Sequence, residues 1–126
     1  EGLEVSAHFY IRRMGEVWQF VSCDDRAWHA GASHYRGRDN CNDYSIGIEL
    51  EGIDGASFEP AQYAALAALV PALMQCYPIQ HLAGHEHVAP GRKTDPGAGF
   101  DWTLLQKKLA LADGCFPEGV LKRKSV

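Results

Sequence analysis

The order of the hydrophobic patterns along the chain limits its fold more than any other feature. Three short segments with the composition or alternation typical of strands come first, at 5–12, 17–22 and 44–52. Two segments with helical spacing follow, at 60–77 and 101–112. This order predicts an α/β fold, a mixed β-sheet flanked by helices. A sheet of only three strands is narrow for the apolar helix surface that it would have to cover.

The strand segments carry clear local signals. The first two are joined by Arg-Met-Gly-Glu, in which Gly15 supplies a turn, so we expect a hairpin. The chain from 23 to 43 shows no period and is expected to be a long irregular loop, a type of segment that often carries function. The third strand alternates between an aliphatic face (Ile46, Ile48, Leu50) and a second face (Ser45, Gly47, Glu49, Glu51).

The helical segments have recognisable ends. Pro60 suits the first position of the first helix, where its missing N–H costs nothing, whereas Pro71 is expected to kink or reset that helix. Asp101 is the predicted cap of the second helix, which should end before Gly114. Residues 113–126 are predicted to form a C-terminal tail.

Length and composition fit a single globular domain over residues 1–126 and exclude several partners. Hydrophobic residues make up 46% of the chain, and the net charge of −4 gives nothing that would attract nucleic acid or anionic lipid. The longest apolar run, at 64–74, is far shorter than the roughly 20 residues of a membrane span. We therefore expect no nucleic-acid partner and no membrane partner.

Cysteine usage indicates a compartment. The four cysteines stand far apart without a Cys-x-x-Cys pair, which argues against a cysteine zinc site. Two disulfides in a secreted chain would be one interpretation. The core composition does not need such cross-links, so we favour free thiols in a reducing cytosol.

The segment from 79 to 99 holds the strongest chemical signal. His85, Lys93 and Asp95 fall within eleven residues of irregular chain. Imidazole and carboxylate are the usual ligands of zinc other than sulfur. Lys93 and Asp95 are two positions apart, so in an extended segment their side chains point to the same side. His87 shares the properties of His85, so spacing alone leaves either histidine as the ligand.

Glu49, Trp28 and His29 are weaker candidates. Glu49 is either a strand carboxylate facing water or a general base beside a metal, and Gly47 leaves room for a ligand near it. Trp28 and His29 lie between small residues, where they would form a flat wall suited to sugar or peptide. Trp28 fits a hydrophobic core equally well.

Four segments, in order, carry a resemblance to a known family: VSAHFYIRRMGE, DRAWHAG, CNDYSIGIELEG and GHEHVAPGRKTDPG. They resemble the zinc-dependent N-acetylmuramyl-L-alanine amidases of the cytoplasmic type that recycle anhydro-muropeptides in Gram-negative bacteria. The resemblance runs from about Val5 to about Leu109. It implies the fold of phage T7-type lysozymes and peptidoglycan recognition proteins, with one zinc ion in a groove. The implied reaction, in the cytoplasm, hydrolyses the amide between (1,6-anhydro-)N-acetylmuramic acid and L-alanine in a small-molecule substrate.

The resemblance also assigns roles to individual residues. His85 matches the second zinc histidine of the family and Asp95 matches its aspartate ligand. Glu49 matches the carboxylate that acts as general base, and Lys93 matches the lysine that stabilises the oxyanion. Trp28, with His29 beside it, matches a loop along the substrate groove.

One part of the family pattern has no match. The first zinc histidine of the family lies on an N-terminal strand ahead of the VSAH segment, and His8 matches a different position. The resemblance therefore implies that the domain is N-terminally incomplete, with that strand and the third zinc ligand absent. The alternative is an inactive, truncated or zinc-free module of the same fold that only binds peptidoglycan.

Overall fold

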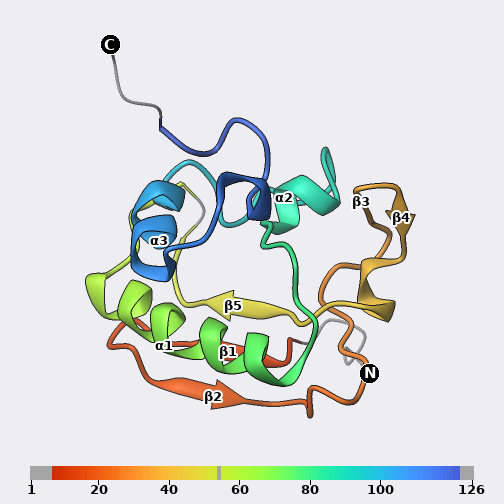
Figure 1. Ribbon diagram of the computed structural model, residues 1–126, viewed down its shortest axis with the longest axis horizontal. Helices are drawn as coiled ribbons and strands as arrows, with labels where there is room; N and C mark the ends of the chain where they lie inside the picture. Colours follow the sequence, from red (N-terminus) through yellow and green to blue (C-terminus); the bar gives the residue numbers. More distant parts are fainter. Residues whose placement is uncertain (1–6, 54, 123–126) are drawn as a thin grey trace.

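A three-stranded mixed sheet lies at the centre of the protein. The computed structural model describes residues 7–53 and 55–122, so residues 5 and 6 of the first predicted strand lie outside the described residues. The strands β1 (Phe9–Ile11), β2 (Val17–Gln19) and β5 (Ile48–Leu50) stand in the order β2-β1-β5. β1 is antiparallel to β2 and parallel to β5, which confirms the predicted mixed sheet (Figure 1).

The predicted hairpin joins β1 to β2. The backbone N–H of Arg12 donates to the carbonyl of Glu16 at 2.8 Å, and that of Gly15 donates to the carbonyl of Arg12 at the same distance. Gly15 has a φ of 90°, in the left-handed region that a residue without Cβ adopts at little cost. The turn therefore depends on the glycine that the sequence indicated.

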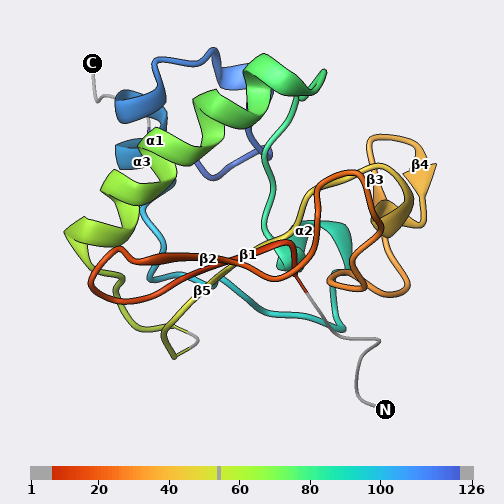
Figure 2. The ribbon, with the colours of Figure 1, turned by 90° about the horizontal axis from the view of Figure 1, so that it is seen from below.

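Two helices, α1 (Pro60–Cys76) and α3 (Trp102–Leu109), lie on the same side of the sheet (Figure 2). α1 begins at Pro60 as predicted, and it continues past Pro71 to Cys76, so Pro71 does not reset it. Asp101 caps α3, because its side chain accepts a hydrogen bond from the backbone N–H of Leu104. No helix in the described residues is long and apolar enough to cross a bilayer.

Gln62 ties α1 to the sheet. Its side chain is buried, and its Nε2 donates to the carbonyls of Ile11 at 3.3 Å and Glu51 at 2.9 Å. These two carbonyls lie at the ends of β1 and β5, so one amide group fixes the helix against both strands. This contact fixes the position of β5, which carries Glu49, relative to α1.

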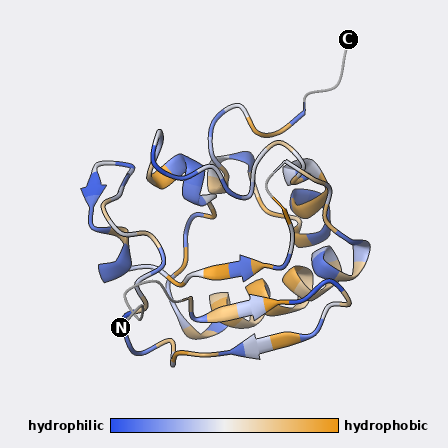
Figure 3. Ribbon diagram, turned by 180° about the vertical axis from the view of Figure 1, so that it is seen from behind, coloured by the Kyte–Doolittle hydropathy of each residue, from blue (hydrophilic) through white to orange (hydrophobic). Residues whose placement is uncertain are grey.

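The core lies between the sheet and the two helices. Aromatic and aliphatic residues from β1, α1, α3 and the segments around α3 fill it, and Figure 3 shows hydrophobic residues on the strands and on α1. The buried residues of α1 and α3 are three or four positions apart, as the predicted helical spacing requires. The buried cluster consists of Ile11, Tyr63, Leu66, Val70, Phe100, Trp102, Leu105 and Phe116.

The segment after α3 differs from the predicted tail. α3 ends at Leu109, and Ala110 adopts a left-handed conformation (φ 55°) that turns the chain back. The short 3₁₀ helix η2 (Asp113–Cys115) follows, and Phe116 is only 1% exposed, in contact with the core. The tail prediction from residue 113 is therefore wrong for this part. Residues 123–126 of that prediction lie outside the described residues.

The expected irregular loop contains small regular elements. Strands β3 (His34–Tyr35) and β4 (Arg38–Asp39) form an antiparallel hairpin, followed by the 3₁₀ helix η1 (Cys41–Asp43). Arg36 and Gly37 at the hairpin tip have φ values of 49° and 84°, as a two-residue turn with left-handed residues requires. All four cysteines are free thiols, as predicted.

Candidate active site

His85 is the first residue of the short helix α2 (His85–Val88), which lies within the segment predicted to be a loop. Asp95 is brought next to it by the chain that follows. The backbone N–H of Glu86 donates to the carbonyl of Asp95 at 2.9 Å. Gly84 allows this approach, since a Cβ there would lie 2.5 Å from Cδ of Pro96. As a result, Nδ1 of His85 lies 2.6 Å from Oδ2 of Asp95.

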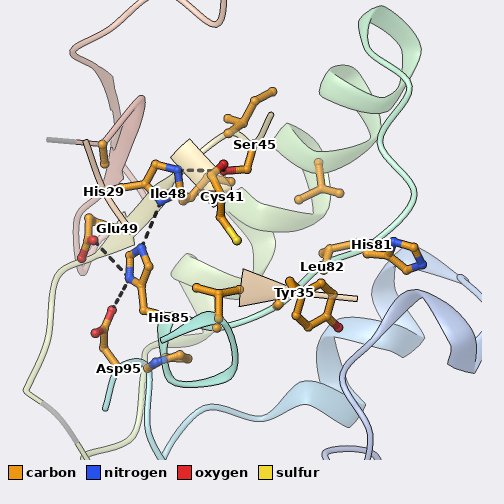
Figure 4. A pocket seen from close by; sticks show the side chains of 18 of the residues that line it. His29, Tyr35, Cys41, Ser45, Ile48, Glu49, His81, Leu82, His85 and Asp95 are labelled. Atoms are coloured by element: carbon orange, nitrogen blue, oxygen red, sulfur yellow. Dashed lines mark hydrogen bonds and ion pairs between the residues drawn. The ribbon is translucent and has the colours of Figure 1, made fainter. Parts of the chain in front are cut away.

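Glu49 lies on β5, and its side chain reaches the pair formed by His85 and Asp95. Its Oε2 lies 3.5 Å from Nδ1 of His85. Glu49, His85 and Asp95 each offer a ligand atom, and these atoms lie within 4.8 Å of one another. One imidazole and two carboxylates form a donor set that suits zinc. Figure 4 shows the three side chains converging from β5, α2 and the chain after α2.

The electrostatics of this group favour an anionic aspartate. The hydrogen bond with His85 is the main cause that holds the pKa of Asp95 below its usual value, and the charge of Lys93 acts in the same direction. Desolvation opposes both effects, since the side chain of Asp95 is 35% exposed and partly withdrawn from water. An ionised carboxylate is the form that a metal ligand needs.

Lys93 lies close to this group without belonging to it. Its backbone N–H donates to the carbonyl of Ala89 at 3.0 Å, in the turn that follows α2. The half-buried Lys93 lines the same cavity as Glu49 and Asp95. The structure therefore gathers the four residues to which the resemblance assigned metal or catalytic roles; the roles themselves stay predictions.

His87, the rival ligand, faces elsewhere. Its Nδ1 accepts a hydrogen bond from the backbone N–H of Gly84 at 2.8 Å, and its ring packs edge-on against Trp102 with 5.6 Å between ring centroids. His87 thus fixes the start of α2 and contacts the core. It is not part of the group formed by Glu49, His85 and Asp95.

The two predicted substrate-binding residues have different surroundings. Trp28 is 44% exposed, with the guanidinium of Arg26 stacked 4.8 Å from its ring centroid. His29 is 6% exposed, and its Nδ1 lies 3.1 Å from Nε2 of His85. Burial is the main cause that lowers the pKa of His29 to about 4, so its ring is neutral at neutral pH. His29 lines the cavity beside His85, whereas Trp28 is partly exposed and is not among the residues that line this cavity.

Ser45 is a site residue that sequence reasoning missed. Its Oγ lies 2.9 Å from Nε2 of His29, and its hydroxyl donates to the carbonyl of Cys41 at 2.6 Å. Ser45 was assigned only to the polar face of a strand, and the hydrogen bond to His29 depends on how the loop before it folds. No spacing in the sequence indicates that contact.

A cavity of about 840 Å³ adjoins the metal-ligand group. Its volume lies within the range of small-molecule sites in proteins. Apolar side chains from β5, α1 and α3 form part of its wall, and further polar residues, among them Arg36, Arg38 and His81, line it as well. β5 stands at an edge of the described three-stranded sheet, beside this cavity. The lining includes Glu49, His85, Lys93 and Asp95 together with Ile48, Leu66, Val70 and Leu105.

Comparison with known proteins identifies the family. The model of the Amidase_2 family, N-acetylmuramoyl-L-alanine amidase, matches residues 1–98. The chain belongs to this family. The match includes Glu49, His85, Lys93 and Asp95, so it covers the whole candidate site of this amidase-family chain.

Curated relatives of this family member carry a more specific name. The 1,6-anhydro-N-acetylmuramyl-L-alanine amidase AmpD of Escherichia coli K12 is 58% identical over 106 residues, which cover 82% of this chain and 58% of that protein. AmpD of Haemophilus influenzae is 48% identical over 103 residues, covering 79% of this chain and 56% of its own length. The amidase-family chain thus spans somewhat more than half the length of these relatives.

Solved structures confirm the predicted fold class. The crystal structure of a Se-Met AmpD derivative superimposes with a TM-score of 0.80 at 53% identity, covering 83% of this chain and 60% of that chain. The E. coli amidase AmiD, in complex with the substrate anhydro-N-acetylmuramic acid-L-Ala-D-γ-Glu-L-Lys, gives a TM-score of 0.77 at 36% identity, covering 83% and 48%. Both relatives share the amidase fold, a mixed sheet with helices.

Proposed function

We propose that this chain carries the catalytic residues of a zinc-dependent amidase that acts in cell-wall recycling. The reaction is hydrolysis of the amide between 1,6-anhydro-N-acetylmuramic acid and L-alanine in peptidoglycan fragments. The observation that carries the proposal is the convergence of Glu49, His85 and Asp95 beside one cavity, in a chain 58% identical to AmpD of E. coli over 106 residues. A role in recycling such fragments would suit a cytoplasmic protein, and we include that location in the proposal.

The donor set supports zinc as the cofactor. Nδ1 of His85 and Oδ2 of Asp95 would hold the ion, and both atoms face the same point as Glu49. When bound, a zinc ion acts as a Lewis acid that makes water more acidic and polarises the scissile carbonyl. Two carboxylates and a nearly buried imidazole offset its charge in a partly enclosed site.

Glu49 and Lys93 would move the proton and stabilise the charge. The carboxylate of Glu49 accepts a proton from the attacking water and passes it to the amide nitrogen, which leaves as the free amine of L-alanine. The ammonium of Lys93 donates a hydrogen bond to the carbonyl oxygen as negative charge develops there. One water is consumed, and the products are the lactyl carboxylic acid and the peptide amine.

The cavity and Trp28 suit the substrate that the AmiD complex contains. A peptide and a sugar need polar anchors at the reacting bond and an apolar surface elsewhere, and the cavity offers both. The exposed indole of Trp28 provides a flat surface for a sugar ring. We propose an anhydro-muropeptide as the small-molecule partner.

The proposal includes a third zinc ligand, a histidine on a strand outside these 126 residues. β5 stands at a sheet edge, and the half-buried Ile48 and Leu50 line the cavity beside it, an arrangement that suits an added strand. Two ligands, one on a single-turn helix and one on the chain after it, fix the geometry of an ion poorly by themselves.

Adding the N-terminal segment of the E. coli relative tests this third ligand. We expect the extended chain to bind zinc more tightly, unfold at a higher temperature and hydrolyse faster, all three together. An extension whose histidine is replaced by alanine is the control, and it should restore stability without tight zinc binding. If the unextended chain holds one zinc tightly with full activity, Glu49 is the third ligand instead.

A zinc-free binding module remains the second candidate, because no histidine of this chain other than His85 joins the group among the described residues. The two functions are separated by incubating the purified chain and zinc with an anhydro-N-acetylmuramyl tripeptide. Mass spectrometry should show the sugar acid and the free tripeptide as products. Recovery of intact substrate that co-elutes with the protein would support the binding module.

A further inference from the structure

A series of hydrogen bonds begins at Nε2 of His85, on the side of the ring opposite to Asp95 and Glu49. Nε2 of His85 lies 3.1 Å from Nδ1 of His29, and Nε2 of His29 lies 2.9 Å from Oγ of Ser45. Oγ of Ser45 lies 2.6 Å from the carbonyl oxygen of Cys41. Figure 4 shows the ring of His29 between Ser45 and His85. The series ends at a backbone carbonyl, which only accepts.

The direction of every hydrogen bond follows from that carbonyl. A serine hydroxyl has one proton, and the contact with Cys41 uses it. Oγ of Ser45 must then accept from Nε2–H of His29. An imidazole ring with one proton has one donor and one acceptor, and the donor of His29 is used toward Ser45. Its Nδ1 therefore accepts from Nε2–H of His85. The proton that Nδ1 of His85 shares with Asp95 is then the one that a bound metal ion would replace, which leaves the lone pair of Nδ1 for the metal.

We propose that His29 and Ser45 are positioning residues that hold His85 with Nε2 protonated and Nδ1 turned toward Asp95 and Glu49 as a metal ligand. This inference rests on the proposed zinc site. Histidines that bind metals usually donate their other ring N–H to a fixed acceptor, which sets tautomer and orientation. Here the acceptor is a second imidazole rather than a carboxylate.

The surroundings of His29 fix its ring in this place. A Cβ at Gly47 would lie 2.3 Å from Cγ of His29, so only glycine leaves room for the ring. The neighbouring Ala30 is anchored through its backbone N–H, which donates to Oδ1 of the buried Asn42 at 2.9 Å. The ring of His8 packs edge-on against His29. Both ring nitrogens of His29 are thus hydrogen-bonded within the protein.

Zinc affinity, measured by calorimetry on the chain extended by the N-terminal segment and on its variants, tests the inference. Ser45→Ala and His29→Leu should each weaken zinc binding about ten- to a hundredfold. His29→Asn keeps an acceptor near the position of Nδ1 and should recover part of that loss. Ser33→Ala is the matched control, because Ser33 also bonds within this loop (to Cys41 and Gly31) but not to the histidines. Its zinc affinity should stay within about twofold of the parent.

Long-range ¹H–¹⁵N spectra of the metal-free chain provide a second readout that a merely structural role would not affect. We expect the ring of His29 to be protonated on Nε2 and bare on Nδ1. Protonation on Nδ1 would overturn the inference, as would equal zinc affinity of the parent and Ser45→Ala. An extended parent chain that binds no zinc would instead overturn the proposed zinc site, and this inference with it.

Discussion

Oε2 of Glu49 lies 3.5 Å from Nδ1 of His85, which joins the sheet edge to the first residue of α2. Glu51, two positions further along, has quite different partners. Its Oε1 accepts a hydrogen bond from the backbone N–H of Arg13 at 3.0 Å and pairs with the side chain of Arg12 at 3.5 Å. The hydrogen bond from Arg13 is the main cause that lowers the pKa of Glu51. Glu49 in β5 therefore lies beside the proposed zinc ligands, whereas Glu51, just after β5, forms an ion pair with arginines at the surface.

Glu49→Gln should lower turnover about 10²- to 10⁴-fold while zinc binding and folding persist, because the amide cannot accept the proton. Glu51→Gln is the matched control and should keep turnover within about twofold, since its partners lie away from the cavity. Steady-state hydrolysis of an anhydro-muropeptide measures both. A Glu49→Gln variant with more than half of the parent rate would return Glu49 to the role of an ordinary strand carboxylate.

Lys93→Ala should lower kcat about 10²- to 10³-fold with little change in KM, because the ammonium acts where negative charge develops. Lys107→Ala, an exposed change near the end of α3, is the control. Separate determination of kcat and KM decides the assignment. A raised KM with an unchanged kcat would show that Lys93 binds a substrate carboxylate instead.

Gly47→Ala should destabilise the protein by about 1–3 kcal/mol, because the new methyl group would overlap the ring of His29. Gly114→Ala has no neighbour within 4 Å and should change stability by less than about 0.5 kcal/mol. Neither glycine has a left-handed φ, so the comparison isolates packing. Urea unfolding measures both. Equal stabilities would mean that His29 is not packed against the strand.

Phe116→Ala should lower the free energy of unfolding by about 3–5 kcal/mol, because it removes a buried aromatic ring from the core. A loss of that size is a large part of the stability of an ordinary domain. The substitution Glu118→Ala, at an exposed position two residues away, should change the free energy of unfolding by less than about 0.5 kcal/mol. The measurement is the thermal unfolding midpoint of the two variants. A small effect of Phe116→Ala would restore the interpretation of this segment as a tail.

The sequence predicted those elements whose signals are local. Gly15 marked the hairpin, Pro60 marked the start of α1 and Asp101 marked the cap of α3, since each acts through its own backbone neighbourhood. The β3–β4 hairpin was missed because each of its strands has only two residues. The helix α2 was missed because it has only four residues, too few to show a helical period.

The candidate site was predictable in part. Spacing drew attention to His85 and Asp95, but it left His87 as an equal rival, and only the fold turns His87 toward Trp102. The contact of Glu49 with His85 joins segments far apart in sequence, so its role came from the family resemblance. The same reason explains why Ser45 was missed.

Removal and return of zinc tests the central claim most directly. The extended chain, freed of metal by a chelator, is assayed for release of the tripeptide from an anhydro-N-acetylmuramyl tripeptide before and after adding Zn²⁺ or Mg²⁺. We predict no release without metal, full recovery with Zn²⁺ but not Mg²⁺, and no recovery in the Asp95→Asn variant. Hydrolysis that survives chelation or the loss of the Asp95 carboxylate would contradict the account, as would a zinc-saturated protein that leaves the amide intact.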